Sequence, residues 1–152
     1  MGRKKTTFLV VYPHPDDVEW SIPGTILRLT REGSHVYYCQ VTDGAAGTLD
    51  ATLTPEKLKA IRRVEIARAQ KVLGVKHNFH LDFPDGNTYD RQAVREKIVR
   101  IIRLVKADIV LCLDPKREAM THIDHRSAAW AGVEAASNAG WPLAHYDQIQ
   151  GE

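Results

Sequence analysis

The stretch Phe8-Leu9-Val10-Val11-Tyr12-Pro13-His14-Pro15-Asp16-Asp17 decides the fold, because an apolar, β-rich run ends in it at a polar corner. An apolar run of this kind that stops at prolines is typical of a buried parallel strand. Open α/β sheets place their chemistry just beyond the carboxyl ends of such strands. The sequence therefore predicts a functional site at residues 14–17.

A second apolar run, Ile109 to Leu113, precedes the stretch Thr121-His122-Ile123-Asp124-His125. His122 and His125 are three residues apart, as are His14 and Asp17. Residues three apart share a face in a turn or at the start of a helix, so each pair can converge on one ion. The carboxyl ends of two strands of one sheet would then supply complementary ligands.

Imidazole nitrogens and carboxylate oxygens suit Zn²⁺, and a catalytic zinc usually keeps three protein ligands and one water. Each stretch also has an ordinary explanation when it is taken alone. An Asp-Asp pair after a strand often caps a helix, and a single His-x-x-His is usually two surface histidines. Only the combination of the two stretches favours a metal site.

Further motifs occur in a fixed order along the chain: His14-Pro15-Asp16-Asp17, Thr42-Asp43-Gly44-Ala45-Ala46-Gly47, Arg62-x-x-Glu65, Leu73-Gly74, Pro84-Asp85-Gly86 and His122-Ile123-Asp124-His125. Together they resemble the signature of the LmbE-like, or PIG-L, family of zinc-dependent de-N-acetylases. The resemblance spans nearly the whole chain. It implies hydrolytic removal of an acetyl group from a small N-acetylated sugar, a glycoconjugate or a related amide.

Three residues are expected to hold Zn²⁺: His14, Asp17 and His125. Asp16 is expected to act as the general base that takes a proton from water. We expect His122 to polarise the developing oxyanion and to help the leaving amine. Asp124 is expected to accept an imidazole N–H and so fix a tautomer.

The resemblance also implies that Arg62 and Asp85 bind sugar hydroxyls. Without it, Arg62 and Glu65 would make an ordinary surface ion pair, three residues apart on a helix. Asp85 would simply hold a turn. Which N-acetylated compound is the substrate is left open, and so is a homo-oligomer.

The 152 residues are enough for one domain with a real core and too few for two. The formal charge of +2 and the scattered basic residues give no reason to expect a nucleic-acid partner. No stretch approaches the ~20 apolar residues of a membrane span, so we expect no such span and a cytoplasmic location. Cys39 and Cys112 fall in strands predicted to flank the first strand, which puts them beyond disulfide reach.

The pattern of apolar residues predicts alternating strands and helices, hence an α/β fold: a three-layer Rossmann-like sandwich with a mostly parallel sheet. Strands are expected over residues 8–12, 35–42, 79–81 and 108–113, the last buried on both faces. Helices are expected over 24–31, 55–73, 91–105 and from 127 to about 140. Trp20 is expected in the core. We expect residues 1–152 to be one LmbE-like domain that lacks the family's C-terminal strands.

Two other interpretations stay open. One is a non-catalytic Rossmann-like module that binds a sugar or a nucleotide, with Gly44-x-x-Gly47 as a phosphate turn. It lacks the Gly-x-Gly-x-x-Gly pattern after the first strand. The other is an inactive fragment of a deacetylase.

Overall fold

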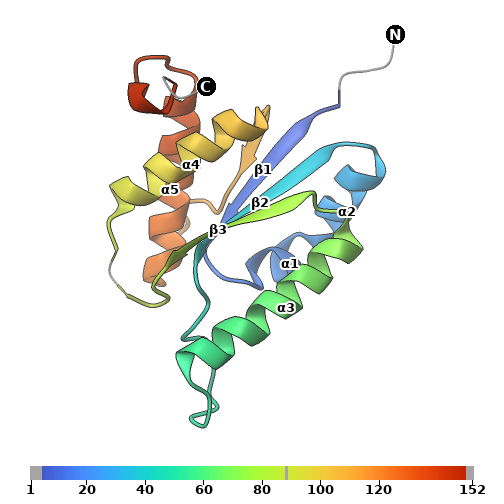
Figure 1. The fold of residues 1–152 in the computed structure, drawn as a ribbon, viewed down its shortest axis with the longest axis vertical. Helices are drawn as coiled ribbons and strands as arrows, with labels where there is room; N and C mark the ends of the chain where they lie inside the picture. The colour runs from blue at the N-terminus through green and yellow to red at the C-terminus, as the bar shows by residue number, and fades with distance from the viewer. Residues whose placement is uncertain (1–4, 88, 150–152) are drawn as a thin grey trace.

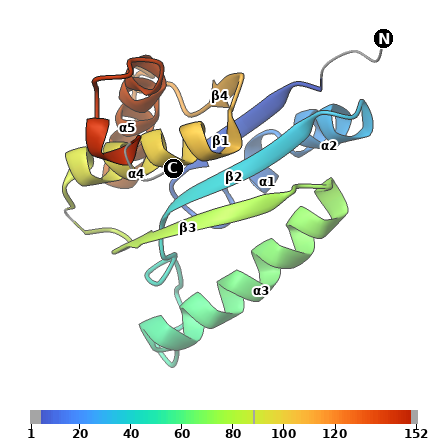
Figure 2. The ribbon, with the colours of Figure 1, turned by 45° about the horizontal axis from the view of Figure 1, so that its top comes forward.

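Four parallel strands form the single sheet of the computed structural model, which describes residues 5–87 and 89–149. Their order across the sheet is β3-β2-β1-β4 (Figures 1 and 2). The strands are β1 (Thr7–Tyr12), β2 (His35–Thr42), β3 (His77–Phe83) and β4 (Ile109–Leu111). The carboxyl ends of the two central strands, β1 and β2, therefore lie side by side at one edge of the sheet.

Helices cover both faces of this sheet (Figures 1 and 2). The helices on one face are α4 (Arg91–Val105) and α5 (Ile123–Ala139). The helices on the other face are α1 (Asp17–Ser21), α2 (Pro23–Arg31) and α3 (Pro55–Leu73). A short 3-10 turn, η1 (Tyr146–Gln148), follows α5. The prediction of a three-layer α/β sandwich is confirmed, and the described sheet is wholly parallel.

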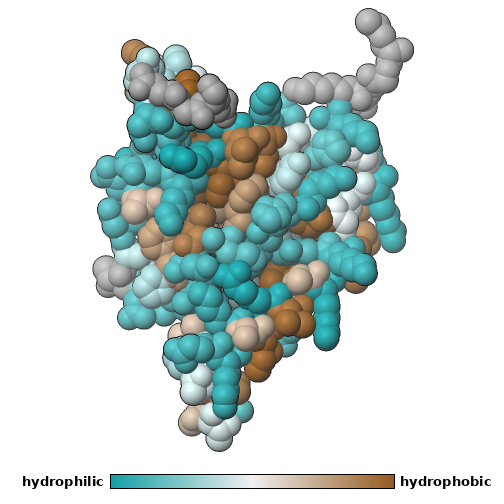
Figure 3. Space-filling model, viewed as in Figure 1, coloured by the Kyte–Doolittle hydropathy of each residue, from teal (hydrophilic) through white to brown (hydrophobic). Residues whose placement is uncertain are grey.

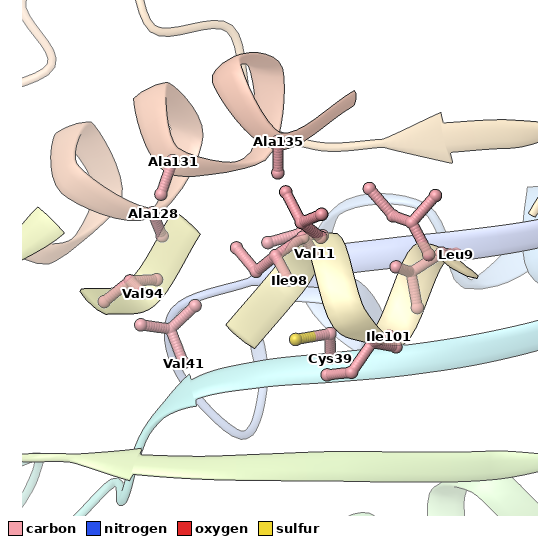
Figure 4. Packing of buried hydrophobic residues seen from close by; sticks show 12 residues of the cluster. Leu9, Val11, Cys39, Val41, Val94, Ile98, Ile101, Ala128, Ala131 and Ala135 are labelled. Atoms are coloured by element: carbon pink, nitrogen blue, oxygen red, sulfur yellow. The ribbon is translucent and has the colours of Figure 1, made fainter. Parts of the chain in front are cut away.

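The two cores follow the period-2 alternation of the central strands. Leu9 and Val11 of β1 pack with α4 and α5, together with Ile98 (Figure 4). Val10 and Tyr12 point the opposite way and pack with the helices of the other face. Because β1 is buried on both faces, its carboxyl end is held firmly, and the polar corner at residues 13–17 starts from a fixed position.

Local signals set the ends of the long helices. The Thr54 hydroxyl accepts a hydrogen bond from the Lys57 N–H at 3.3 Å, and Gly74 ends α3 in the left-handed conformation at φ 73°. The Asp90 carboxylate accepts a hydrogen bond from the Gln92 N–H at 2.8 Å and so begins α4. The predicted ranges of both helices are confirmed.

The edge strands differ from their predictions. β4 covers only Ile109–Leu111, and Ile109 is 42% exposed, so the prediction of a strand buried on both faces over residues 108–113 was wrong. The reason is the sheet order, which places β4 at an edge with β1 as its one neighbour. β3 extends over His77–Phe83 rather than residues 79–81, because it pairs along most of β2.

Two further expectations were wrong near the polar corners. α5 begins at Ile123 rather than at residue 127, because the His122 side chain caps it. Trp20 lies on the additional short helix α1 and is 92% exposed, so it is not a core residue. In α1 it is Val18 that is buried against the sheet.

The cysteine prediction is confirmed in part: both cysteines are free and Cys39 lies in β2, but Cys112 follows β4 rather than lying within it, because β4 ends at Leu111. Hydrophilic side chains cover most of the face seen in Figure 3. Several large apolar side chains of α3 are nevertheless exposed, among them Ile61, Val64 and Val72. Among the described residues, no helix has the length and apolar character needed to cross a membrane.

The alternation of the core gives a stability prediction. Ile98 is fully buried in α4, whereas Leu104 of the same helix is 61% exposed. Ile98→Ala should lower the free energy of unfolding by about 2–5 kcal/mol, because it removes buried contacts and leaves a cavity. Leu104→Ala should change it by less than about 0.5 kcal/mol. Urea unfolding of the two variants measures both values, and equal losses would contradict this packing.

Candidate metal centre and active site

Hydrogen bonds stabilise the corner after β1, both within the corner and between the corner and β2. The Pro13 carbonyl accepts hydrogen bonds from the Thr42 N–H at 3.0 Å and from the Thr42 hydroxyl at 2.8 Å. The His14 N–H donates to Asp17 Oδ2 at 2.8 Å, and the Asp17 N–H donates to the His14 carbonyl at 3.3 Å. This closed turn brings the two side chains, three residues apart, onto one side of the corner.

His14, Asp17 and His125 converge on one point. His14 Nδ1 lies 3.2 Å from His125 Nε2 and 3.3 Å from Asp17 Oδ2, and His125 Nε2 lies 3.3 Å from Asp17 Oδ1. Ligand bonds of about 2.0–2.1 Å to a tetrahedral zinc place neighbouring ligand atoms about 3.3–3.4 Å apart. The nitrogens of His14 and His125 therefore already have the spacing of two ligands of one such ion, while Asp17 faces each of them with a different oxygen.

The charge around His14 also favours a cation. Its imidazole lies within 3.3 Å of the carboxylates of Asp17, Asp85 and Asp124. Burial alone would lower the pKa of His14, but hydrogen bonds to these carboxylates outweigh it and raise the pKa to about 10. Burial likewise opposes ionisation of Asp17, yet its contacts with His125 and His14 hold its pKa well below the usual range. A divalent ion would meet the same negative charge.

Asp124 is fully buried beneath this centre. Its Oδ2 accepts a hydrogen bond from the Gly86 N–H at 2.8 Å and lies 3.1 Å from His14 Nε2. Among the described residues its Oδ1 has no hydrogen-bond partner. A carboxylate on the second nitrogen of a metal-binding histidine is the usual arrangement, so Nδ1 is the atom of His14 that suits a metal.

A second set of donors, His14, His122 and Asp124, also lies close together. It would use the opposite nitrogen of His14. In it His122 Nδ1 is 3.9 Å from Asp124 Oδ2, and that nitrogen already accepts a hydrogen bond from the Asp124 N–H at 3.3 Å. The set with Asp17 and His125 is the better match, because the facing nitrogens of His14 and His125 lie 3.2 Å apart and, among the described residues, neither accepts a backbone hydrogen bond.

His122 occupies the N-cap of α5 with its side chain half-exposed. Because its Nδ1 accepts the backbone hydrogen bond, a neutral ring carries its hydrogen on Nε2. The ring stands edge-on to that of His14, with centroids 4.7 Å apart. His122 thus offers an N–H donor beside the centre.

Asp16 is exposed and makes no side-chain hydrogen bond to cap α1. Its Oδ2 lies 3.4 Å from Arg62 Nη1. Arg62 also lies 3.6 Å from the Glu65 carboxylate and donates to the Gly47 carbonyl at 3.4 Å. The pair between Arg62 and Glu65 that helix spacing predicts is present, but Arg62 also connects α3 to the corner that bears Asp16.

Asp85 lies closer to the centre than the sequence suggested. It is buried, its Oδ1 lies 3.2 Å from His14 Nε2, and its Oδ2 accepts a hydrogen bond from the Ala46 N–H at 3.0 Å. The Asp43 carboxylate joins this arrangement by accepting from the N–H groups of Ala45 and Asp85. Asp43 had no predicted role, although an aspartate before glycine is a common turn signal.

A pocket of about 290 Å³ opens above these groups. Every predicted site residue except the buried Asp124 lines it: His14, Asp16, Asp17, Arg62, Asp85, His122 and His125. Gly44 borders it at φ 69°, where a Cβ atom would lie 2.5 Å from the Pro15 ring. Larger hollows near Gly33 and Ser34 contain no comparable group of metal-binding side chains.

The fold and the site define a parallel α/β protein with a candidate metal centre at the carboxyl ends of its strands. The family model described as PIG-L: GlcNAc-PI de-N-acetylase matches residues 9–136, and the chain belongs to this family. The resemblance seen in the motifs is thereby confirmed.

The curated relatives include two whose names describe deacetylases of N-acetylated sugars. The chain is 41% identical to a diacetylchitobiose deacetylase of Thermococcus kodakarensis over 134 residues, which cover 88% of this chain and 50% of the relative. It is 34% identical to a probable N-acetyl-alpha-D-glucosaminyl L-malate deacetylase 2 of Bacillus cereus, over 85% of this chain and 60% of the relative. The chain thus spans about half to three fifths of the length of these relatives.

Solved structures agree on the fold. An N,N'-diacetylchitobiose deacetylase from Pyrococcus horikoshii superposes with a TM-score of 0.91 at 32% identity, covering 97% of this chain and 55% of that one. The 4-carboxy-2-hydroxymuconate hydratase GalB from Pseudomonas putida has a TM-score of 0.82 at 23% identity, over 91% of this chain and 59% of that one. The second likeness shows the fold alone.

The geometry predicts which variants lose metal. Replacing His14, Asp17 or His125 by alanine should each lower the zinc content of the purified protein, because one of three protein ligands is removed. The exposed His77 is the control, and His77→Ala should keep its zinc. His122→Ala should also keep it, whereas loss of zinc in His122→Ala but not in His125→Ala would select the other donor set. Elemental analysis of the folded proteins decides.

Proposed function

We propose that the chain carries the catalytic centre of a zinc-dependent hydrolase that removes an acetyl group from an N-acetylated sugar or a related amide. The observation that carries this proposal is the convergence of His14, Asp17 and His125, with contacts of 3.2–3.3 Å between their side chains, beside the exposed carboxylate of Asp16. We keep the interpretation of the chain as a single LmbE-like domain as part of the same proposal. The deacetylase names of the relatives support the substrate class.

Zinc suits the donor set of two imidazoles and one carboxylate better than magnesium or calcium, which prefer oxygen ligands alone. When bound, it supplies a Lewis acid and lowers the pKa of a water molecule to about 7. The protein's part is to present the three donors already spaced, with Asp124 holding the orientation of the His14 ring.

Asp16 is the proposed general base. It follows directly after the corner that supplies His14, yet its carboxylate faces Arg62 rather than the three proposed ligands. Both oxygens of Asp17 already lie against imidazole nitrogens, so Asp16 is the carboxylate that remains free for water. The ion pair with Arg62 orients it over the pocket.

His122 is the proposed donor to the oxyanion. Its Nδ1 is occupied by a backbone N–H, so the hydrogen on Nε2 is available to the carbonyl oxygen of the amide as charge develops there. The departing amine takes up the proton that Asp16 removed from water, and His122 helps it leave by holding the charge on the carbonyl oxygen. The helix cap fixes the orientation of the neutral ring for this role.

Arg62 and Asp85 are the proposed sugar-binding residues. Both line the pocket. Arg62 offers donors, and the carboxylate of Asp85 offers only acceptors, as sugar hydroxyls require. The contacts of Asp85 with His14 and Ala46 give it a second task, because they hold the loop after β2 against the centre.

The rival interpretation as a nucleotide-binding module is weakened by the turn at Gly44. A phosphate turn presents free backbone N–H groups. Here the Ala45 N–H donates to Asp43 and the Ala46 N–H donates to Asp85. Carboxylates thus occupy the donors that a phosphate would need. A pure, folded protein that never binds zinc would favour the binding module.

The inactive-fragment interpretation concerns the length of the chain. If zinc binds but this chain cleaves no amide, while a version extended toward the length of its relatives does, the fragment interpretation is correct.

A cytoplasmic location is also part of the proposal, since two free cysteines agree with a reducing compartment. The oligomeric state stays open, and sedimentation would determine it.

The direct test of the activity is release of free amine from N-acetylglucosamine derivatives, measured with zinc present and with zinc chelated. Turnover that depends on zinc is expected because the centre needs its ion. Turnover that is unchanged under chelation would contradict a metal hydrolase. The adjacent carboxylates then allow a sharper test.

Asp16→Asn and Asp17→Asn should fail in different ways. Asp16→Asn keeps the shape of the side chain but cannot accept a proton, so zinc should stay bound and turnover should fall by roughly 10²–10⁴. Asp17→Asn should lower the zinc content itself. Zinc stoichiometry and amine release on both variants decide this point. An Asp16→Asn protein that is loaded with zinc and fully active would place the base elsewhere.

A further inference from the structure

Trp20 has no task in the centre described above. It lies on α1, three residues after Asp17, and 92% of its surface is exposed. Tryptophan is highly buried on average, because its large ring gains most from leaving water. An almost fully exposed indole beside a candidate active site therefore needs an explanation.

A second hollow, of about 410 Å³, lies at this indole. Its lining consists of Asp16, Asp17, Glu19 and Trp20. Asp16 and Asp17 also line the pocket of the candidate metal centre, so the two hollows adjoin at these carboxylates. A molecule held in the first pocket can thus extend onto the indole.

The lining of the second hollow selects a type of ligand. An indole face offers a broad apolar surface with a negative quadrupole, and the carboxylates beside it offer only hydrogen-bond acceptors. A pyranose ring matches both, with an apolar face of C–H groups and a rim of hydroxyl donors. The negative charges of Asp16 and Asp17 disfavour phosphates and other anions, whereas both carboxyl oxygens of Glu19 are buried.

We propose that Trp20 is a stacking platform for a second sugar ring, the ring linked to the N-acetylated ring that is deacetylated. This proposal rests on the proposed function and deepens it. It makes Trp20 a residue that determines specificity for disaccharides over monosaccharides. It also gives a reason for the exposure of the indole, since the substrate itself covers it.

The chain contains a matched control. Trp141 is 69% exposed as well, but it lies after α5, where its carbonyl accepts a hydrogen bond from Arg103 at 3.0 Å. It lines neither of the two hollows. Removing its indole should change surface hydrophobicity to a similar degree without touching the platform.

The kinetic test compares diacetylchitobiose with N-acetylglucosamine on the zinc-loaded protein. Trp20→Ala should lower kcat/KM for the disaccharide by about tenfold, as expected for loss of one aromatic contact, and leave the monosaccharide nearly unchanged. Trp20→Phe should recover part of the loss, and Trp141→Ala should change neither substrate. Equal losses on both sugars, or a lower zinc content in Trp20→Ala, would mean a structural role and overturn the proposal.

A binding test separates this proposal from the proposed function. Chitobiose, the disaccharide without acetyl groups, and glucosamine are titrated into the zinc-loaded protein while tryptophan fluorescence is followed. The disaccharide should change the fluorescence of the wild type and of Trp141→Phe but not of Trp20→Phe. A change of equal size in Trp20→Phe overturns the platform. A change that depends on Trp20 in a protein without deacetylase activity keeps the platform and rejects the hydrolase.

Discussion

The contact of one imidazole with three carboxylates is the interaction on which the site depends. His14 meets Asp17 through Nδ1 and meets Asp85 and Asp124 through Nε2, all within 3.3 Å. These carboxylates come from the first turn after β1, from the loop after β3 and from the start of α5. Three carboxylates at such distances repel one another, and a cation among them offsets this repulsion. The fold therefore creates a place that favours a cation.

Backbone N–H groups stabilise this arrangement of carboxylates by hydrogen bonds. The Gly86 N–H donates to Asp124, and the Ala46 N–H donates to Asp85. Asp43 in turn accepts from the Asp85 N–H, so the loop after β2 holds the loop after β3. Each donor offsets part of the repulsion and fixes one carboxylate relative to a strand end. Hydrogen bonds, and not packing alone, thus fix the carboxylates of the site relative to the ends of the strands.

Local patterns in the sequence were enough to predict the bounds of α3 and to bring His14 and Asp17 onto one side of a turn. Thr54-Pro55 and Gly74 define α3 because caps act within one turn, and the three-residue spacing of His14 and Asp17 is likewise local. Features that depend on distant neighbours could not be read in this way. The exposure of Ile109 follows from the position of β4 in the sheet, and the contact of Asp85 with His14 joins residues 71 positions apart.

Likeness of fold does not by itself select a reaction here, because a hydratase shares the fold with a TM-score of 0.82. The selection has to come from the side chains at the strand ends. A deacetylase needs a free carboxylate next to a metal and a donor for the oxyanion. The chain separates these tasks with adjacent residues: Asp17 is fixed by two imidazoles while Asp16 stays exposed. In the same way, His122 caps α5 through Nδ1, so its neutral ring keeps one N–H, on Nε2. His125, in the first turn of the same helix, faces Asp17. In the proposed function, two short turns thereby divide metal binding from proton transfer, which is the property that a metal-dependent amide hydrolase requires and that a binding module does not.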